Sequence, residues 1–132
     1  MQLTKFTEYS LRLLVYLAHE AKPEKRYSLE FISEEINVTK NHLAKIAKNL
    51  VNAGYIQSSQ GRTGGLWLER DPSTIKLGDV IMVTEDTPYR INCSELRCPL
   101  RRYCSLSDLI FEAQMEFVNK MNETTLNDVI HK

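Results

Sequence analysis

The sequence lacks the features that mark unusual classes of protein. It carries no net charge, because 17 lysines and arginines balance 17 aspartates and glutamates, and it contains no low-complexity segment. It also lacks an apolar run long enough to span a bilayer, since Arg12 interrupts the run at 11–18. We therefore expect one small globular domain, with room for one appended helix, that stays in the cytoplasm and has no membrane partner.

Catalytic patterns are also missing. The chain shows no nucleophile paired with a base and no glycine motif that would hold a phosphate after a strand. It has three histidines, and none lies near another plausible catalytic group. The sequence therefore predicts a protein that is not an enzyme.

Acidic residues are absent from one long stretch, between Ile36 and Leu68. Four basic residues lie within the same stretch, namely Lys40, Lys45, Lys48 and Arg62. A neutral chain that leaves acids out of one segment presents a surface to which a polyanion is attracted. A merely solvated basic face is the alternative, and we favour double-stranded DNA as the partner of this segment.

Periodicity and capping residues predict three helices and a hairpin before residue 72. The first helix should begin after Thr7, whose hydroxyl would cap it, and run to about Glu20; a polar connector follows at 21–27. A second helix should run from its cap Ser28 to Ile36, and a third from Thr39 until Gly54 stops it. Strands at 55–60 and 66–70 should pair around the turn GRTGG. The order predicts a mainly α fold with a small β-hairpin, a winged helix-turn-helix over 1–72.

The third helix would then be the element that enters the major groove. Asn41 could pair bidentately with adenine, the lysines could hold phosphates, and Arg62 suits a narrow minor groove. His42 could equally be a surface residue without a role, and the wing glycines could serve the turn alone. The candidate DNA-binding residues are Ser28, Thr39, Lys40, Asn41, His42, Lys45, Lys48, Arg62, Thr63 and Gly64.

The rest of the chain divides into a connecting helix with a cysteine loop at 73–104 and two helices at 105–132. The longer helix should run from Ser105 to about Met121, with an apolar stripe that includes Leu106, Leu109 and Val118. A small domain has little surface with which to cover so long a helix, so we expect a homodimer, with folding back on the same domain as the alternative. A capping box from Thr125 to Asp128 predicts a short last helix.

All three cysteines lie in one loop, Cys93, Cys98 and Cys104, together with Pro99 and three arginines. Thiolates at this spacing can converge on one centre, and the arginines favour thiolates over thiols. Zinc fits less well, because structural zinc sites draw on four ligands and no fourth cysteine or histidine is near. An iron–sulfur cluster on three cysteines would need a fourth ligand from elsewhere or would leave one iron exposed, and a reactive thiol switch would need no further ligand.

Several segments together resemble the Rrf family of winged-helix regulators, in particular its nitric-oxide-sensing members. They are MQLTKFTEYSLRLL, VTKNHLAKIAKNLVNAGYI, GRTGG, NCSELRCPLRRYC and TLNDVI, and they extend over nearly the whole chain. The resemblance implies a homodimer that binds promoter DNA and holds a [4Fe–4S] or [2Fe–2S] cluster through Cys93, Cys98 and Cys104. It also implies repression that ends when nitric oxide nitrosylates the cluster.

The same resemblance points to the fourth ligand. A cluster-assembly branch of the family places a histidine ligand where this chain has Ser107, so that match is broken. Nitric-oxide-sensing members can use an aspartate near the amino terminus of the partner subunit, and the matching residue is Glu8. The alternative for Glu8 is an ordinary first-turn acid that interacts favourably with the helix dipole. Related regulators of cluster status, iron or thiol redox state, and more remotely a small iron–sulfur electron carrier, remain alternatives.

Overall fold

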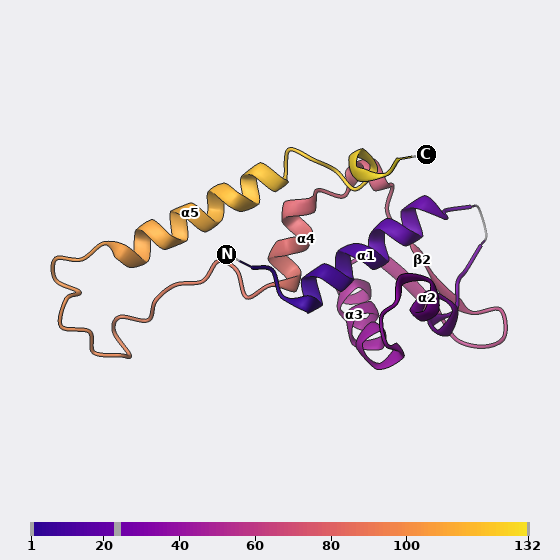
Figure 1. Ribbon diagram of the computed structural model, residues 1–132, viewed down its shortest axis with the longest axis horizontal. Coiled ribbons are helices and arrows are strands. Elements are labelled where there is room, and N and C mark those ends of the chain that lie inside the picture. Colours follow the sequence, from indigo (N-terminus) through magenta and orange to yellow (C-terminus); the bar gives the residue numbers. More distant parts are fainter. Residues whose placement is uncertain (1, 23–24, 132) are drawn as a thin grey trace.

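A computed structural model of the chain describes residues 2–22 and 25–131. It contains helices α1 (Lys5–His19), α2 (Leu29–Ile36) and α3 (Lys40–Asn52), and then an antiparallel pair of strands, β1 (Ile56–Ser59) and β2 (Gly65–Leu68). The 3₁₀ turn η1 (Pro72–Thr74), helices α4 (Leu77–Thr84) and α5 (Leu106–Met121) and the turn η2 (Asn127–Val129) follow. The mainly helical fold with a single described hairpin confirms the predicted fold class (Figure 1). No helix of the described residues is both long and apolar enough to cross a membrane.

The first helix begins earlier than predicted. Thr4, not Thr7, is its N-cap, and the Thr4 hydroxyl accepts a hydrogen bond from the Thr7 backbone N–H at 3.3 Å. Thr7 is fully buried in the first turn. The prediction of Thr7 as the cap was wrong because both threonines precede the apolar run, so the sequence does not distinguish them. The structure does, because the Glu85 carboxylate accepts hydrogen bonds from the Thr4 backbone N–H (2.7 Å) and the Thr4 hydroxyl (2.8 Å).

Helices α2 and α3 form the helix-turn-helix as predicted. Ser28 caps α2 by accepting from the Phe31 N–H, and Thr39 caps α3 by accepting from the His42 N–H. Asn37 ends α2 in the left-handed region (φ 55°), which turns the chain at once into α3. Buried apolar residues of these elements meet those of α1 in one core; they include Leu13, Leu14, Ile32, Val38, Leu43, Ile46 and Leu50.

The hairpin packs one face on this core. Ile56 pairs with Leu68, and Ser58 with Leu66, with Ile56 and Leu66 buried. Part of the predicted connector at 21–27 lies outside the described residues, but Tyr27 forms an isolated antiparallel bridge with Leu66. The chain before α2 is thereby attached to the edge of β2.

The last segment returns to α4. Leu126 is fully buried and donates its N–H to the Ile75 carbonyl at 2.8 Å, and Lys76 bridges to Thr125. The predicted last helix is a single 3₁₀ turn, η2; Asp128 does accept from the Thr125 N–H at 2.9 Å, as a capping box requires. The return to α4 limits how far this segment can continue as a helix.

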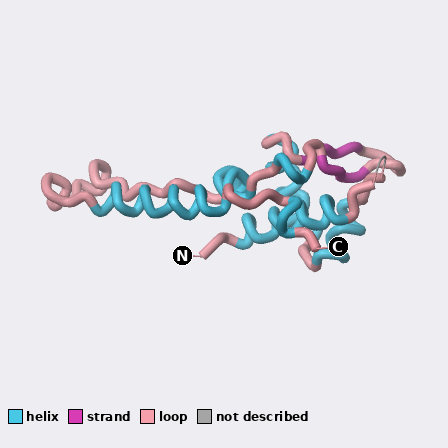
Figure 2. The backbone as a smooth tube through the Cα atoms, turned by 90° about the horizontal axis from the view of Figure 1, so that it is seen from above, coloured by secondary structure: helices cyan, strands magenta, loops and turns pink. Residues whose placement is uncertain are grey.

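Helix α5 extends as an arm beyond the rest of the molecule (Figures 1 and 2). Val118 near its carboxyl end is buried, whereas Leu106 and Leu109 near its amino end are 51% and 61% exposed. Figure 2 shows the loop that precedes α5 at one end of the molecule and the hairpin toward the other. The chain alone therefore leaves half of the predicted apolar stripe uncovered.

Candidate functional site

Helix α3 presents a polar face opposite its buried one. Lys40, Asn41, His42, Lys45 and Lys48 are all exposed, while Leu43, Ile46, Ala47 and Leu50 point into the core. The helix therefore has the amphipathic form that lets one face pack and the other meet a partner.

A groove separates α3 from the hairpin. Residues from three elements line it: Ser28 from the start of α2, Lys40 and Lys48 from α3, and Ser59 and Gly64 from the hairpin. Arg62 and Thr63 are exposed at the tip of the wing. The structure thus brings most of the candidate DNA-binding residues to one side of the molecule.

Sequence reasoning missed an acid in this groove. Glu30, on α2, lines it, and its Oε1 lies 3.7 Å from Lys40 Nζ. Glu30 lies outside the acid-free segment along the chain but beside it in space. The sequence offered one sign of this. Glu30 lies six residues before the acid-free segment, near the start of the helix that precedes α3.

The cysteine loop begins with one capped helical turn. The Asn92 side chain accepts from the Glu95 N–H at 3.0 Å, and the Cys98 N–H donates to the Cys93 carbonyl at 3.0 Å. Arg97 adopts a positive φ of 49°, which closes the turn in the way a left-handed residue closes a helix. Cys93 and Cys98 therefore lie at the two ends of the same turn.

The start of the cysteine loop is fastened to α5, the helix into which the end of the loop continues. The Gln114 amide donates to the Tyr89 carbonyl (2.7 Å) and accepts from the Tyr89 N–H (2.8 Å). Arg90 donates to Asp108 at 3.1 Å and lies 3.9 Å from the centre of the Phe111 ring. These contacts hold the approach to Cys93 along the helix that follows Cys104.

The three cysteines are free, with Cys93 and Cys98 half-buried and Cys104 exposed. Across residues 2–22 and 25–131, no three side chains of Cys, His, Asp or Glu lie in a group that could hold a metal ion. The loop therefore carries donor residues that suit a metal centre, but their side chains do not lie together as a metal site. Both views place it at the far end of the arm from α1, the helix that carries Glu8 (Figures 1 and 2).

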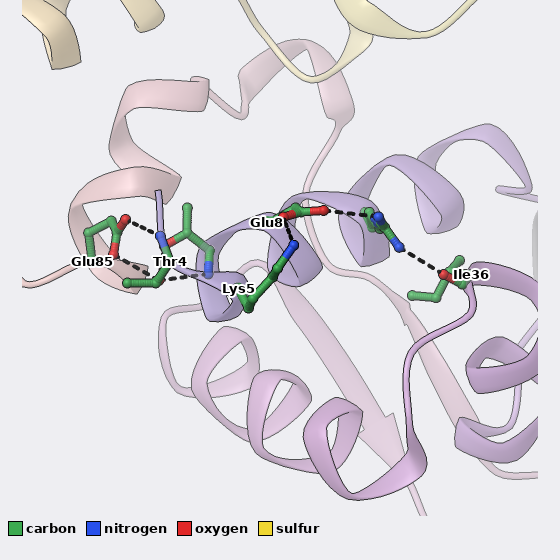
Figure 3. A network of polar contacts seen from close by, with 7 residues as sticks. Thr4, Lys5, Glu8, Ile36 and Glu85 are labelled. Carbon is green, nitrogen blue, oxygen red and sulfur yellow. Dashed lines mark hydrogen bonds and ion pairs between the residues drawn. The ribbon is translucent and has the colours of Figure 1, made fainter. Parts of the chain in front are cut away.

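Glu8 belongs to a chain of polar contacts on α1 (Figure 3). Its Oε2 accepts from Lys5 Nζ at 3.1 Å, and its Oε1 accepts from Arg12 at 2.9 Å. The hydrogen bond from Lys5, and the positive charges of Lys5 and Arg12, lower the pKa of the Glu8 carboxyl. Arg12 also donates to the carbonyl of Ile36, the last residue of α2, at 3.3 Å. One guanidinium thus joins Glu8 to the turn between α2 and α3.

Comparison with known proteins identifies the family of the chain. The family described as Rrf2, iron-dependent transcriptional regulator, matches residues 3–132. This chain belongs to that family. It is 34% identical to the HTH-type transcriptional regulator NsrR of Bacillus subtilis (strain 168), over 98% of this chain and 90% of the relative.

Two solved structures show the same fold. The global cysteine regulator CymR of B. subtilis superposes with a TM-score of 0.74 at 26% identity, over 98% of this chain and 95% of the other. IscR of T. potens superposes with a TM-score of 0.72 at 23% identity, over 97% and 85%, a likeness that bears on the fold alone. As a member of the Rrf2 family, this chain is a DNA-binding transcriptional regulator and not an enzyme.

Ser107 occupies the position at which the sequence leads us to expect a histidine ligand in the cluster-assembly branch. Its hydroxyl donates to the Ile91 carbonyl at 3.3 Å. The side chain therefore helps to fasten the loop to α5. A ligand at this position would have to give up that contact.

Proposed function

We propose that this chain is a homodimeric repressor that binds promoter DNA and senses nitric oxide through an iron–sulfur cluster of the [4Fe–4S] or [2Fe–2S] type. The dimer releases DNA when the cluster is nitrosylated or lost. The observation that carries the proposal is the placement of three free cysteines and three arginines on one anchored loop, joined through α5 and α4 to the helix-turn-helix. The likeness to NsrR over nearly the whole chain supports it.

The DNA contacts follow from the exposed face of α3. Asn41 would read an adenine edge in the major groove, and Lys40, Lys45 and Lys48 would hold phosphates. The hydroxyls of Ser28 and Thr39 accept backbone N–H groups as caps and keep their own hydrogens free to donate to phosphates. His42 lies beside Tyr9 of α1, with the ring centroids 6.2 Å apart, and Arg62, Thr63 and Gly64 would enter the minor groove from the wing.

The donor set of the loop suits an iron–sulfur cluster. Cys93, Cys98 and Cys104 would be the thiolate ligands, and Arg97, Arg101 and Arg102 lower the cost of gathering negative charge there. A bound cluster supplies iron with which nitric oxide reacts. Three thiolates leave one position for a ligand from outside the loop, and a carboxylate oxygen can fill it.

A second copy of the chain is the natural source of that carboxylate. Helix α1, which carries Glu8, lies away from the cysteine loop of the same chain, so Glu8 can reach a cluster only in another subunit (Figures 1 and 2). Leu3, Leu11 and Val15 line an open apolar groove on α1, with Glu8 at its side. The uncovered Leu106 and Leu109 of α5 need an apolar surface of this kind.

The contacts of Glu8 suggest how the cluster would act on DNA binding. If Glu8 held iron in the partner subunit, its carboxylate would have to weaken the hydrogen bonds that it now accepts from Lys5 and Arg12. Arg12 is the one of these two that also reaches the Ile36 carbonyl. A change at Glu8 would therefore alter the contact that fixes the start of the turn before α3, and so shift the population of DNA-competent dimers.

The test is anaerobic. Iron and sulfide in the purified protein are measured, and promoter binding is followed while nitric oxide is titrated. Bound iron and sulfide, with loss of DNA binding on titration, are expected; equal promoter affinity of the loaded and nitrosylated protein would contradict the proposal. Arg12→Gln should reduce the ratio of the two affinities. Lys5→Gln is the matched control, because it removes the other contact of Glu8 and does not touch α2.

A thiol-redox regulator is the second candidate. The observation that favours it is the placement of Cys93 and Cys98 at the two ends of one turn. The same measurement separates the two functions. A protein free of iron and sulfide whose promoter affinity changes with thiol oxidation would support this candidate and exclude the cluster.

A further inference from the structure

Arg26 lies against the hairpin although it belongs to the connector between α1 and α2. Its guanidinium carbon is 4.2 Å from the centre of the Trp67 ring, and its NH1 donates to the Ser59 hydroxyl at 3.2 Å. Trp67 is in β2 and Ser59 is the last residue of β1. The Ser59 contact places the guanidinium beside the end of the hairpin that leads into the wing tip, while Trp67, which pairs with Gln57, lies further along β2.

The strand register tells which face of the hairpin Arg26 covers. Ile56 and Leu66 are buried against the core. Alternate residues of a strand point to opposite faces, so Trp67 and Ser59 lie on the other face. Arg26 therefore stacks on the outer face, while Ser59 also lines the groove that faces α3.

The backbone holds Arg26 in this place. The Tyr27 N–H donates to the Leu66 carbonyl at 3.2 Å, and the Leu66 N–H donates to the Tyr27 carbonyl at 2.7 Å. A Cβ on Gly65 would lie 2.5 Å from the Tyr27 carbonyl oxygen, so glycine is what permits this close approach. The arginine is thus positioned before any partner binds.

We propose that Arg26 binds a phosphate of double-stranded DNA on the outer side of the wing, beyond the bases that α3 would read. An arginine stacked on an aromatic ring keeps the edge of its guanidinium free, and that edge matches the geometry of a phosphate. Its position next to the Gln60–Gly64 loop places the charge where the wing meets the sugar-phosphate backbone. The contact widens the DNA footprint and carries no base preference.

A purely structural arginine would cover Trp67 and do nothing more, and Arg70 offers the matched control. Its guanidinium carbon lies 5.0 Å from the centre of the Tyr55 ring, and its NH2 donates to the Thr74 carbonyl at 3.1 Å. It follows β2 at the opposite end of the hairpin from the wing tip, beside the Ile56–Leu68 pair. The two arginines therefore share stacking and charge, and differ in which end of the hairpin they occupy.

The experiment measures affinity for a mixed-sequence duplex at several salt concentrations, using the full chain and the variants Arg26→Gln, Arg26→Lys and Arg70→Gln. Each phosphate contact contributes about 0.9 to the slope of log affinity against log salt. Arg26→Gln should lower the slope by about that amount. Arg26→Lys should keep most of the slope, since the charge remains, and Arg70→Gln should leave it unchanged.

Two results would overturn the proposal. One is an unchanged slope for Arg26→Gln together with a lower melting temperature, which would make the residue structural. The other is an equal loss of slope in Arg26→Gln and Arg70→Gln, which would reflect overall charge alone. If Arg26→Gln does not fold, phosphate-ethylation interference with the unmodified protein decides, because the proposal requires an interfering phosphate outside the bases contacted by α3. The test does not depend on the proposed cluster, since it needs DNA binding alone.

Discussion

Gly78→Ala should change the stability of the protein through two opposing effects. Alanine favours a helix, whereas the added Cβ would meet atoms of α5. Gly78 lies in the first turn of α4, where α4 packs on the carboxyl end of α5. A Cβ at this position would overlap the Val118 carbonyl oxygen and the Asn122 side chain. The Val118 oxygen is backbone and accepts from the Asn122 N–H at 2.9 Å, so it cannot move without disturbing α5.

The magnitudes decide the sign. Alanine is favoured over glycine within a helix by about 1 kcal/mol. Overpacking costs about 1–3 kcal/mol, and contact with a fixed backbone atom places this site at the upper end. The net expectation is a loss of about 2 kcal/mol in the free energy of unfolding. For a chain of this length the melting temperature should fall by roughly 8 °C, since 1 kcal/mol corresponds to roughly 4 °C.

Urea and thermal unfolding, each followed by circular dichroism, would measure the change. Asn122→Ala is made alone and together with Gly78→Ala, since it removes the flexible obstacle and leaves the Val118 carbonyl in place. The double variant should recover only part of the loss caused by the added Cβ. A Gly78→Ala protein as stable as the unmodified one, or more stable, would refute the close packing of α4 on α5.

Three further predictions concern individual side chains. Glu30→Gln should tighten binding to a mixed-sequence duplex several-fold, because it removes a negative charge that repels DNA phosphates and that pairs with Lys40. Two unit charges about 4 Å apart interact by about 1 kcal/mol in water. Unchanged or weaker binding would show that Glu30 does not face DNA. Asn41→Ala should lose about 1–3 kcal/mol of discrimination at a single base pair in a set of substituted operators, and a uniform loss would contradict base reading. Burial, with the nearby Glu35 and Glu20 carboxylates, raises the pKa of Tyr16 from 10.0 to about 12. Stability should therefore fall as pH rises from 10 to about 12, because the unfolded chain ionises first, and Tyr16→Phe should lessen that fall.

Local signals were sufficient for most of the helices. Ser28 and Thr39 cap the helices that they were expected to cap, and Leu43, Ile46 and Leu50 are buried as the spacing predicted. Capping depends on a hydrogen bond between residues three apart, and helical periodicity on residues three or four apart. Both are properties of a short stretch of chain, and they are therefore readable from the sequence.

The errors at the two ends came from contacts between distant segments. Thr4 and Thr7 are equally good caps in sequence, and the hydrogen bond that the Thr4 N–H donates to Glu85, 81 positions away, distinguishes Thr4. The capping box at Thr125 is present, yet the helix after it is one 3₁₀ turn, because the Leu126 N–H donates to the Ile75 carbonyl instead of continuing a helix. Tertiary hydrogen bonds and burial outweighed the local preference at both places.

The grouping of the three cysteines and the acid-free segment needed no structure, because each is a property of neighbouring residues. Packing alone brought Glu30 beside Lys40, Arg26 onto Trp67, and Arg12 between Glu8 and Ile36. It also placed α1, the helix of Glu8, and the cysteine loop in separate parts of the molecule (Figures 1 and 2). Side chains from different elements meet only where those elements bury their apolar faces together, and burial depends on the whole chain, not on any one stretch of it.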